Sequence, residues 1–227
     1  DPILNFEKFL IEKDIINNHK INNKRYEISN EIETALEITF NEPEIEADIE
    51  TELNDVYKDF NFQKIIASNN ISEKRFIDSI SDGLKQAMEK HQDLVIMGQD
   101  IADYGGVFKI TKGFLELFGK NRIRNTPICE SAIIETAMGL SIAGIKSIVE
   151  LQFADFISSG FNPVVNYLAK SHYRWGQEAN IVLRMPCGAG VGAGPFHSQT
   201  NEAWFTKTPG LKAVSYTHLT LPTTSPV

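Results

Sequence analysis

Residues 94–98, Leu-Val-Ile-Met-Gly, are the part of the sequence that decides the fold class. A short, continuous apolar run that a glycine stops is typical of a strand buried on both faces of a parallel sheet. Two later runs, SIVEL at 147–151 and IVLRM at 181–185, repeat this signature, and helical stretches at 132–143 and 154–170 separate the three. Strands that alternate with helices predict a doubly wound, mainly parallel α/β structure, which binds ligands beyond the carboxyl ends of its strands.

Helices and a charged linker are predicted ahead of this α/β region. Residues 1–40 indicate two helices, with Asp1 as a cap for the first. Like charge accumulates at 42–50 and disfavours compact structure, so residues 41–70 are expected to form an acidic linker. A further helix over residues 51–60 is the alternative, because four apolar residues there have helical spacing: Leu53, Val56, Tyr57 and Phe60.

A long amphipathic helix is predicted to open the α/β domain, which we expect to extend over residues 71–214. Ser72 is the expected cap of this helix. Residues 215–227 do not continue the pattern and are assigned to no domain; foreign sequence is one interpretation of them. The apolar stripe of the helix consists of Phe76, Ile77, Ile80, Leu84, Ala87 and Met88.

The composition narrows the classes of function. The chain has 227 residues, of which 42% are hydrophobic, enough to bury a core. Its net charge of -8 argues against nucleic-acid binding, which depends on clustered Lys and Arg. No apolar run approaches the roughly 20 residues of a membrane-spanning helix and no secretory signal is present, so no membrane partner and a cytoplasmic location are expected. Cys129 and Cys187 have no C-x-x-C spacing and indicate neither a disulfide framework nor a metal site.

A glycine-rich loop, GAGVGAG at residues 188–194, directly follows the last predicted strand. A dinucleotide-binding fingerprint needs its glycines to open a helix, but no helical stripe begins after Pro195. The small residues allow positive φ angles and the close approach of a flat ligand, and a plain surface loop is the alternative. His197, just beyond the loop, is placed for proton transfer, although a structural hydrogen-bonding role explains a single histidine equally well.

Further candidate side chains are expected where the loops leave the sheet. Glu130 follows an extended segment that contains Pro127 and meets a helix. A carboxylate there either serves a ligand or merely stabilises the helix amino terminus by about 0.3–1 kcal/mol. Gln152, Asp155 and Phe156 follow the strand at 147–151, and each is a candidate for ligand binding or an ordinary cap or core residue.

Taken together, these strings resemble the β subunit of the decarboxylating component of the pyruvate and branched-chain 2-oxoacid dehydrogenase complexes. The resemblance runs from about residue 71 to residue 214, and five motifs in one order are far more specific than any single motif. The motifs are GQD (98–100) with YGGVF (104–108), NTPICE (125–130), QFADF (152–156), the glycine loop with HSQ (197–199), and TPGLK (208–212).

Residues 1–58 resemble a different protein, the carboxyl end of the α subunit of the same component. The motifs are DPI (1–3), FEK (6–8) and DVY (55–57). This second resemblance implies a natural fusion of the two subunits, joined by the acidic linker. Together with the absence of an initiating Met, it implies that the chain is a fragment, inactive without the upstream α-like region.

The resemblance implies the cofactor thiamine diphosphate, with magnesium held by the α-like region. In this family a glutamate forms a hydrogen bond with a ring nitrogen of the aminopyrimidine, and Glu130 matches that position. Phe156 matches the residue that stacks on the ring, Gln152 the residue that lines its pocket, and Ile128 a residue that touches the cofactor. His197 matches the residue that faces the reacting carbons and assists proton handling or acyl transfer.

The activity that this resemblance implies is oxidative decarboxylation of a 2-oxoacid with acyl transfer to a lipoyl group. Overall resemblance favours branched-chain 2-oxoacids over pyruvate. The implied partners are the α-like region, a lipoyl-bearing acyltransferase and a second copy in a homo-oligomer. The alternatives are another thiamine enzyme, such as a transketolase-like or deoxyxylulose-phosphate-synthase-like protein, and a non-catalytic assembly module.

Overall fold

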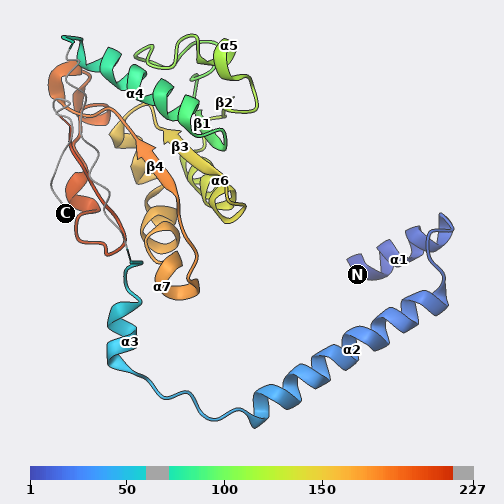
Figure 1. The fold of residues 1–227 in the computed structure, drawn as a ribbon. Coiled ribbons are helices and arrows are strands. Elements are labelled where there is room, and N and C mark those ends of the chain that lie inside the picture. The colour runs from blue at the N-terminus through green and yellow to red at the C-terminus, as the bar shows by residue number, and fades with distance from the viewer. Residues whose placement is uncertain (60–71, 217–227) are drawn as a thin grey trace. The chain divides into compact units, whose positions relative to one another are not determined.

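The computed structural model of the chain describes residues 1–59 and 72–216 (Figure 1). The contacts divide the chain into two units, one formed by Asp1–Asp48 and one that begins at Ile49. In the part that the structure describes, no helix combines the length and apolar character that crossing a membrane requires.

Two helices form the first unit, as the spacing predicted. They are α1 (Pro2–Glu12) and α2 (Asn18–Asn41). The Asp1 carboxylate accepts hydrogen bonds from the first backbone N–H groups of α1, and Asn17 caps α2 in the same way. An ion pair of 2.7 Å between Arg25 and Glu7 joins the two helices.

The described part of the predicted linker, up to residue 59, contains the last residue of α2 and one short helix. Residues 42–48 have neither helix nor strand, and α3 (Ile49–Asn54) follows. This helix begins before the alternative helix that the spacing suggested and ends before Tyr57, while Phe60 lies outside the described residues. The Tyr173 hydroxyl donates to the Glu52 carboxylate at 2.5 Å, which ties α3 to the α/β domain. The boundaries of tail, linker and domain remain predictions.

Four parallel strands form the sheet, in the order β2-β1-β3-β4. β1 (Leu94–Gly98), β3 (Lys146–Glu150) and β4 (Ile181–Arg184) lie on the three predicted runs. β2 (Ile123–Asn125) was not predicted, because only one of its three residues is apolar. The pairs Ile96↔Ile123 and Ile96↔Ile148 set the register on both sides of β1.

Helices cover both faces of the sheet, which confirms the prediction of a doubly wound α/β fold (Figure 1). α4 (Phe76–Lys90) and α5 (Phe114–Phe118) pack on one face, and α6 (Glu130–Ile142) and the π-helical turn η2 (Pro163–Leu168) pack on the other.

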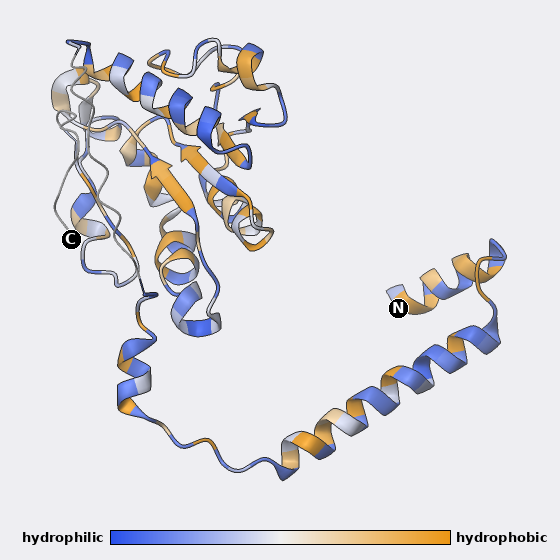
Figure 2. Cartoon of the chain, viewed as in Figure 1, coloured by the Kyte–Doolittle hydropathy of each residue, from blue (hydrophilic) through white to orange (hydrophobic). Residues whose placement is uncertain are grey.

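Successive residues of β1 enter the two different cores. Ile96 packs with the α4 side and Met97 with the α6 side, since side chains alternate along a strand. This alternation explains why Leu94–Met97 of β1 are all apolar. Apolar residues also predominate in β4, whose arrow is mainly orange in Figure 2, whereas β3 also contains charged residues.

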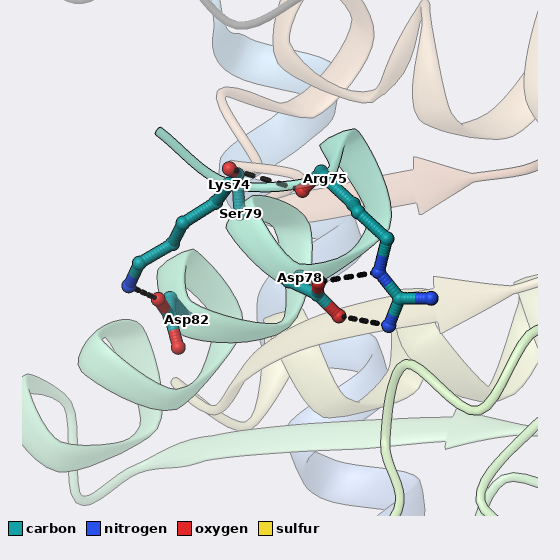
Figure 3. Close-up of polar contacts among 5 residues, drawn as sticks. All are labelled: Lys74, Arg75, Asp78, Ser79 and Asp82. Atoms are coloured by element: carbon teal, nitrogen blue, oxygen red, sulfur yellow. Dashed lines mark hydrogen bonds and ion pairs between the residues drawn. The ribbon is translucent and has the colours of Figure 1, made fainter. Parts of the chain in front are cut away.

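The start of α4 differs from the prediction, which made Ser72 its cap. The helix begins at Phe76, with Arg75 in the N-cap position and no side-chain capping bond. Instead, the Arg75 guanidinium makes two hydrogen bonds with Asp78 in the first turn, at 2.7 and 2.8 Å (Figure 3). This contact lowers the pKa of Asp78. The first turn of α4 thus carries an acidic residue paired with Arg75, and the expected serine cap is wrong.

The predicted helix at 154–170 is also wrong in detail. This segment contains the 3-10 turn η1 (Ala154–Ser158) and then η2, and the separate helix α7 (Ser171–Trp175) follows. Pro163 has no N–H to donate, so a regular helix cannot continue through it. Gly160 packs so closely that a Cβ atom there would lie 2.4 Å from Ile134 Cδ1 of α6.

Candidate functional site

The topological switch point of the sheet lies between β1 and β3. From β1 the chain crosses to β2 on one side, and it then returns to β3 on the other side of β1. Such sheets bind ligands in the crevice at the carboxyl ends of the two diverging strands. Gln99 and Asp100 follow β1 there, and Gln152 and Phe156 follow β3.

The segment that carries Glu130 is fixed against the end of β1 by two hydrogen bonds. Thr126 N–H donates to the Gly98 carbonyl at 3.0 Å, and Ala102 N–H donates to Asn125 Oδ1 at 2.7 Å. Glu130 then begins α6, where the partial positive charge of the helix amino terminus favours a carboxylate. The position of Glu130 at the edge of the sheet therefore follows from hydrogen bonds that the preceding residues make with the end of β1 and the loop after it.

The Glu130 carboxylate is held by two neutral donors. Gln99 Nε2 donates to Oε1 at 3.1 Å, and the Ser159 hydroxyl lies 3.4 Å from Oε2. Glu130 is half-buried, Gln99 is only 5% exposed, and no ion pair joins Glu130 to a cation among the described residues. Each carboxylate oxygen keeps a further lone pair, so the group can accept a hydrogen bond from a ligand or share its proton.

His197 stands against two aromatic rings. Its ring centroid lies 5.1 Å from that of Phe153 and 5.4 Å from that of Phe156, and both contacts are edge-to-face. The two phenylalanine rings also meet edge-to-face, at 5.9 Å. This cluster leaves the half-buried imidazole in a largely apolar setting.

Ser159 links the carboxylate to the aromatic cluster. Its hydroxyl lies 2.8 Å from the Phe156 carbonyl oxygen and can donate either to it or to Glu130. Three predicted site residues, Glu130, Phe156 and His197, are thus joined by a continuous series of contacts.

The other two predicted site residues lie at the margin. Gln152 Nε2 donates to Asp100 Oδ2 at 3.2 Å and so bridges the ends of β3 and β1. Ile128 is 83% exposed, and its side chain is free to contact a ligand or another protein surface.

The glycine-rich loop forms two short 3-10 turns and no α-helix. These turns are η3 (Ala189–Val191) and η4 (Gly194–Phe196). The predicted positive φ angles are confirmed at Gly188, Gly192 and Gly194, with values of 107°, 67° and 74°. A loop of this form cannot present a helix amino terminus to a pyrophosphate, which agrees with the sequence-based argument against a dinucleotide fingerprint.

Three residues at the site received no role from the sequence. Gln99 had a usable signal, because it is a polar residue directly after a buried strand, where ligands bind in this fold. Phe153 lies inside the QFADF motif (152–156), but the sequence assigned no role to it. Ser159 had no signal, since its contacts depend on the η1 turn in place of the regular helix that the spacing predicted.

A family comparison agrees with this geometry. Residues 73–219 match the family model described as "Transketolase, pyrimidine binding domain", a match over more than half of the chain. The chain belongs to this family.

Individual relatives are similar over the same region. The chain is 40% identical over 146 residues to 2-oxoisovalerate dehydrogenase subunit beta of Bacillus subtilis, covering 63% of the chain and 45% of that protein. It is 40% identical over 151 residues to the mitochondrial 2-oxoisovalerate dehydrogenase subunit beta of Dictyostelium discoideum, covering 64% and 40%. It is 39% identical over 141 residues to pyruvate dehydrogenase E1 component subunit beta of Acholeplasma laidlawii, covering 61% and 43%. The chain thus spans less than half the length of these relatives.

Proposed function

We propose that this chain forms the part of a thiamine-diphosphate-dependent 2-oxoacid dehydrogenase that binds and activates the cofactor's aminopyrimidine ring. The observation that carries the proposal is the Glu130 carboxylate, held at the switch point by Gln99 and Ser159 and paired with no described cation. A carboxylate oriented in this way is suited to a hydrogen bond with a ring nitrogen.

The neighbouring side chains fit a flat heterocycle with apolar faces and a polar edge. Phe156 offers an aromatic surface, and the exposed Ile128 offers an aliphatic one. Gln152 adds an amide at the rim, although its side chain is turned towards Asp100. Glu130, Ile128, Gln152 and Phe156 would hold the ring.

Glu130 and His197 would handle protons at the reacting centre. Bound thiamine diphosphate supplies the electron sink for decarboxylation. Glu130 would hold a proton at the ring nitrogen, through a charge-assisted bond of the kind that contributes about 1.5–3 kcal/mol. His197 would assist proton handling or transfer of the acyl group to a lipoyl group. Phe153 and Phe156, which border the imidazole, would keep water from two of its sides.

The names of the relatives support a 2-oxoacid as the substrate. Those from Bacillus subtilis and Dictyostelium discoideum are named for 2-oxoisovalerate, which favours branched-chain 2-oxoacids. The Acholeplasma laidlawii relative, at 39% identity, is named for pyruvate, so pyruvate is the alternative.

The remaining partners belong to the same proposal. The α-like region, to which residues 1–58 would contribute the carboxyl end, would hold the diphosphate and magnesium. A lipoyl-bearing acyltransferase would receive the acyl group, the assembled component would be a homo-oligomer, and it would act in the cytoplasm.

A substrate panel on the complete protein, including its α-like region, tests the proposal. We expect branched-chain 2-oxoacids to be decarboxylated faster than pyruvate, in the presence of thiamine diphosphate, magnesium and an artificial electron acceptor. Glu130→Gln should reduce turnover by about 10²–10⁴-fold, the usual contribution of a positioned proton-transfer group, without unfolding the protein. Transfer of a ketol group between sugar phosphates would instead make the chain transketolase-like, and inactivity towards every substrate would leave an assembly module.

A further inference from the structure

Two consecutive residues of η1, Ala154 and Asp155, close the base of the glycine-rich loop. Ala154 N–H donates to the Pro186 carbonyl at 2.8 Å, and the Ala154 carbonyl accepts from Asn201 Nδ2 at 2.9 Å. Between these points, Asp155 Oδ1 accepts a hydrogen bond from the Gln199 backbone N–H at 3.2 Å. We call these three hydrogen bonds the loop clasp. They attach both ends of residues 187–200 to η1.

Asp155 provides the contact of the clasp closest to His197. At the start of the loop, the Cys187 thiol donates to Glu202 Oε1 at 3.9 Å. The hydrogen bonds nearer to His197 are internal: Gly192 N–H donates to Ala189, His197 N–H to Gly194, and Gln199 Nε2 to Pro195. They shape the loop but do not fix it to the sheet. In residues 72–216, the Asp155 carboxylate is thus the hydrogen-bonding anchor outside the loop that attaches nearest to His197, at Gln199, two residues further along the chain.

The surroundings of Asp155 argue that the residue has a purpose other than stability. Asp155 is only 7% exposed, and its Oδ2 atom is buried without a hydrogen-bond partner, as is the nearby Ser198 Oγ. A buried carboxylate that is only partly satisfied destabilises a fold, by about 1–3 kcal/mol for each polar group left unpaired. An apolar residue of the same size would pack at lower cost, so the acceptor itself is the feature that needs an explanation.

We propose that Asp155 is a positioning residue, which holds the His197 imidazole against Phe153 and Phe156 through the loop clasp. Phe156 is the next residue on the same turn, so η1 fixes both the anchor of the loop and one of the rings that His197 contacts. The proposal rests on the proposed function in one respect: His197 is taken to serve acyl transfer more than decarboxylation.

Three substitutions separate the carboxylate from the size of the side chain. Asp155→Leu removes the acceptor but keeps the branched shape of the side chain, and Asp155→Ala removes both. Asp155→Asn keeps an acceptor oxygen for Gln199 N–H and should restore the clasp. Thr200→Ala, at an exposed position in the same segment, is the matched control.

Amide hydrogen exchange of the 227-residue chain tests the clasp without any activity measurement. We expect exchange at Gln199 and across residues 188–199 to become at least about tenfold faster in Asp155→Leu and Asp155→Ala, because a local anchor is lost. Asp155→Asn and Thr200→Ala should exchange like the wild type. If Asp155→Ala does not fold, the test rests on Asp155→Leu. Amide exchange in the loop of a folded Asp155→Leu variant that is as slow as in the wild type overturns the proposal.

Two reactions of the complete enzyme test the consequence for His197. With a lipoyl domain as the acceptor, Asp155→Leu should slow acyl transfer by about tenfold or more, since a misplacement of about 1 Å can cost up to 10²-fold. Decarboxylation with an artificial acceptor should change much less, and Asp155→Asn should restore acyl transfer. Equal losses in both reactions overturn the positioning role. A wild-type enzyme that acts on no 2-oxoacid refutes the proposed function. The hydrogen-exchange experiment would still test the loop clasp, because it does not depend on activity.

Discussion

Gln99 Nε2 lies 3.1 Å from Glu130 Oε1, so that a neutral, buried amide orients the carboxylate at the switch point. The two residues are 31 positions apart in the chain and meet because β1 pairs with β2 in the register Gly98↔Asn125. A neutral donor fixes the direction of a carboxylate without neutralising its charge. This property is what a proton-sharing site for a heterocycle requires.

Replacement of this amide by an acid should change the pH dependence of decarboxylation. In Gln99→Glu, two carboxyl groups would face each other and compete for one proton, which raises the pKa of one of them. Two neighbouring carboxyl groups repel each other when both are ionised, so the second one loses its proton only at higher pH. The acidic limb of the pH profile of kcat of the complete enzyme should therefore move to higher pH, by about one unit or more. Gln99→Leu, which removes the donor without adding an acid, is the control. An identical profile for Gln99→Glu and wild type would show that Gln99 does not orient Glu130.

Loss of the second donor should have a smaller effect. Ser159→Ala removes a contact of 3.4 Å from a hydroxyl that can also donate to the Phe156 carbonyl. We expect decarboxylation to fall less than about tenfold, because the contact is longer than an ordinary O–H···O hydrogen bond and the hydroxyl has a second acceptor. Steady-state kinetics of the complete enzyme would measure this. A loss as large as that of Glu130→Gln would mean that Ser159 itself contacts the reacting groups.

Two glycine substitutions should change stability in opposite directions. A Cβ atom at position 98 would lie 2.4 Å from the Glu150 carbonyl oxygen, inside the sheet, whereas one at position 139 meets nothing within 4 Å. Gly98→Ala should destabilise the domain by about 1–3 kcal/mol through overpacking. Gly139→Ala, in the interior of α6, should stabilise it by about 0.4–1 kcal/mol. Thermal unfolding of the 227-residue chain measures both, and equal melting temperatures would contradict the close strand contact.

Alkylation of Cys187 should be slow and should depend on Glu202. Desolvation by the surrounding protein and the neighbouring Glu202 carboxylate raise the pKa of the Cys187 thiol, although the residue is exposed. A raised pKa leaves less thiolate near neutral pH, and the thiolate is the reactive form. Glu202→Gln should therefore lower this pKa and speed reaction with iodoacetamide, measured by mass spectrometry in a Cys129→Ser background. A rate that is unaffected by Glu202→Gln between pH 7 and 9 would exclude the electrostatic effect.

The sequence predicted the sheet better than the segments that surround it. The β1, β3 and β4 runs are rich in apolar residues because both faces of the sheet are covered. β2 was not predicted from the sequence, because its only apolar residue is Ile123. The region after β3 was wrongly expected to be one helix, since the effects of Pro163 and of the close packing at Gly160 override the helical spacing.

The candidate site was predictable to the extent that it depends on topology. Glu130 and Phe156 follow elements that end at one edge, so their proximity follows from a parallel sheet. The contacts of Gln99 and Ser159 with Glu130 depend on side-chain directions that no spacing pattern contains. The roles of Glu130, His197, Ile128, Gln152 and Phe156 in binding and catalysis stay predictions.

The η1 turn and the residue after it bring three separate tasks into five neighbouring positions of the chain, 155–159. Asp155 anchors a loop, Phe156 borders the imidazole, and Ser159, the residue that ends the turn, reaches the Glu130 carboxylate. Any movement of this turn displaces all three groups at once. Substitutions at these positions should therefore fail to combine additively, and a double-mutant cycle between Asp155 and Ser159 would register this coupling although the two side chains share no bond.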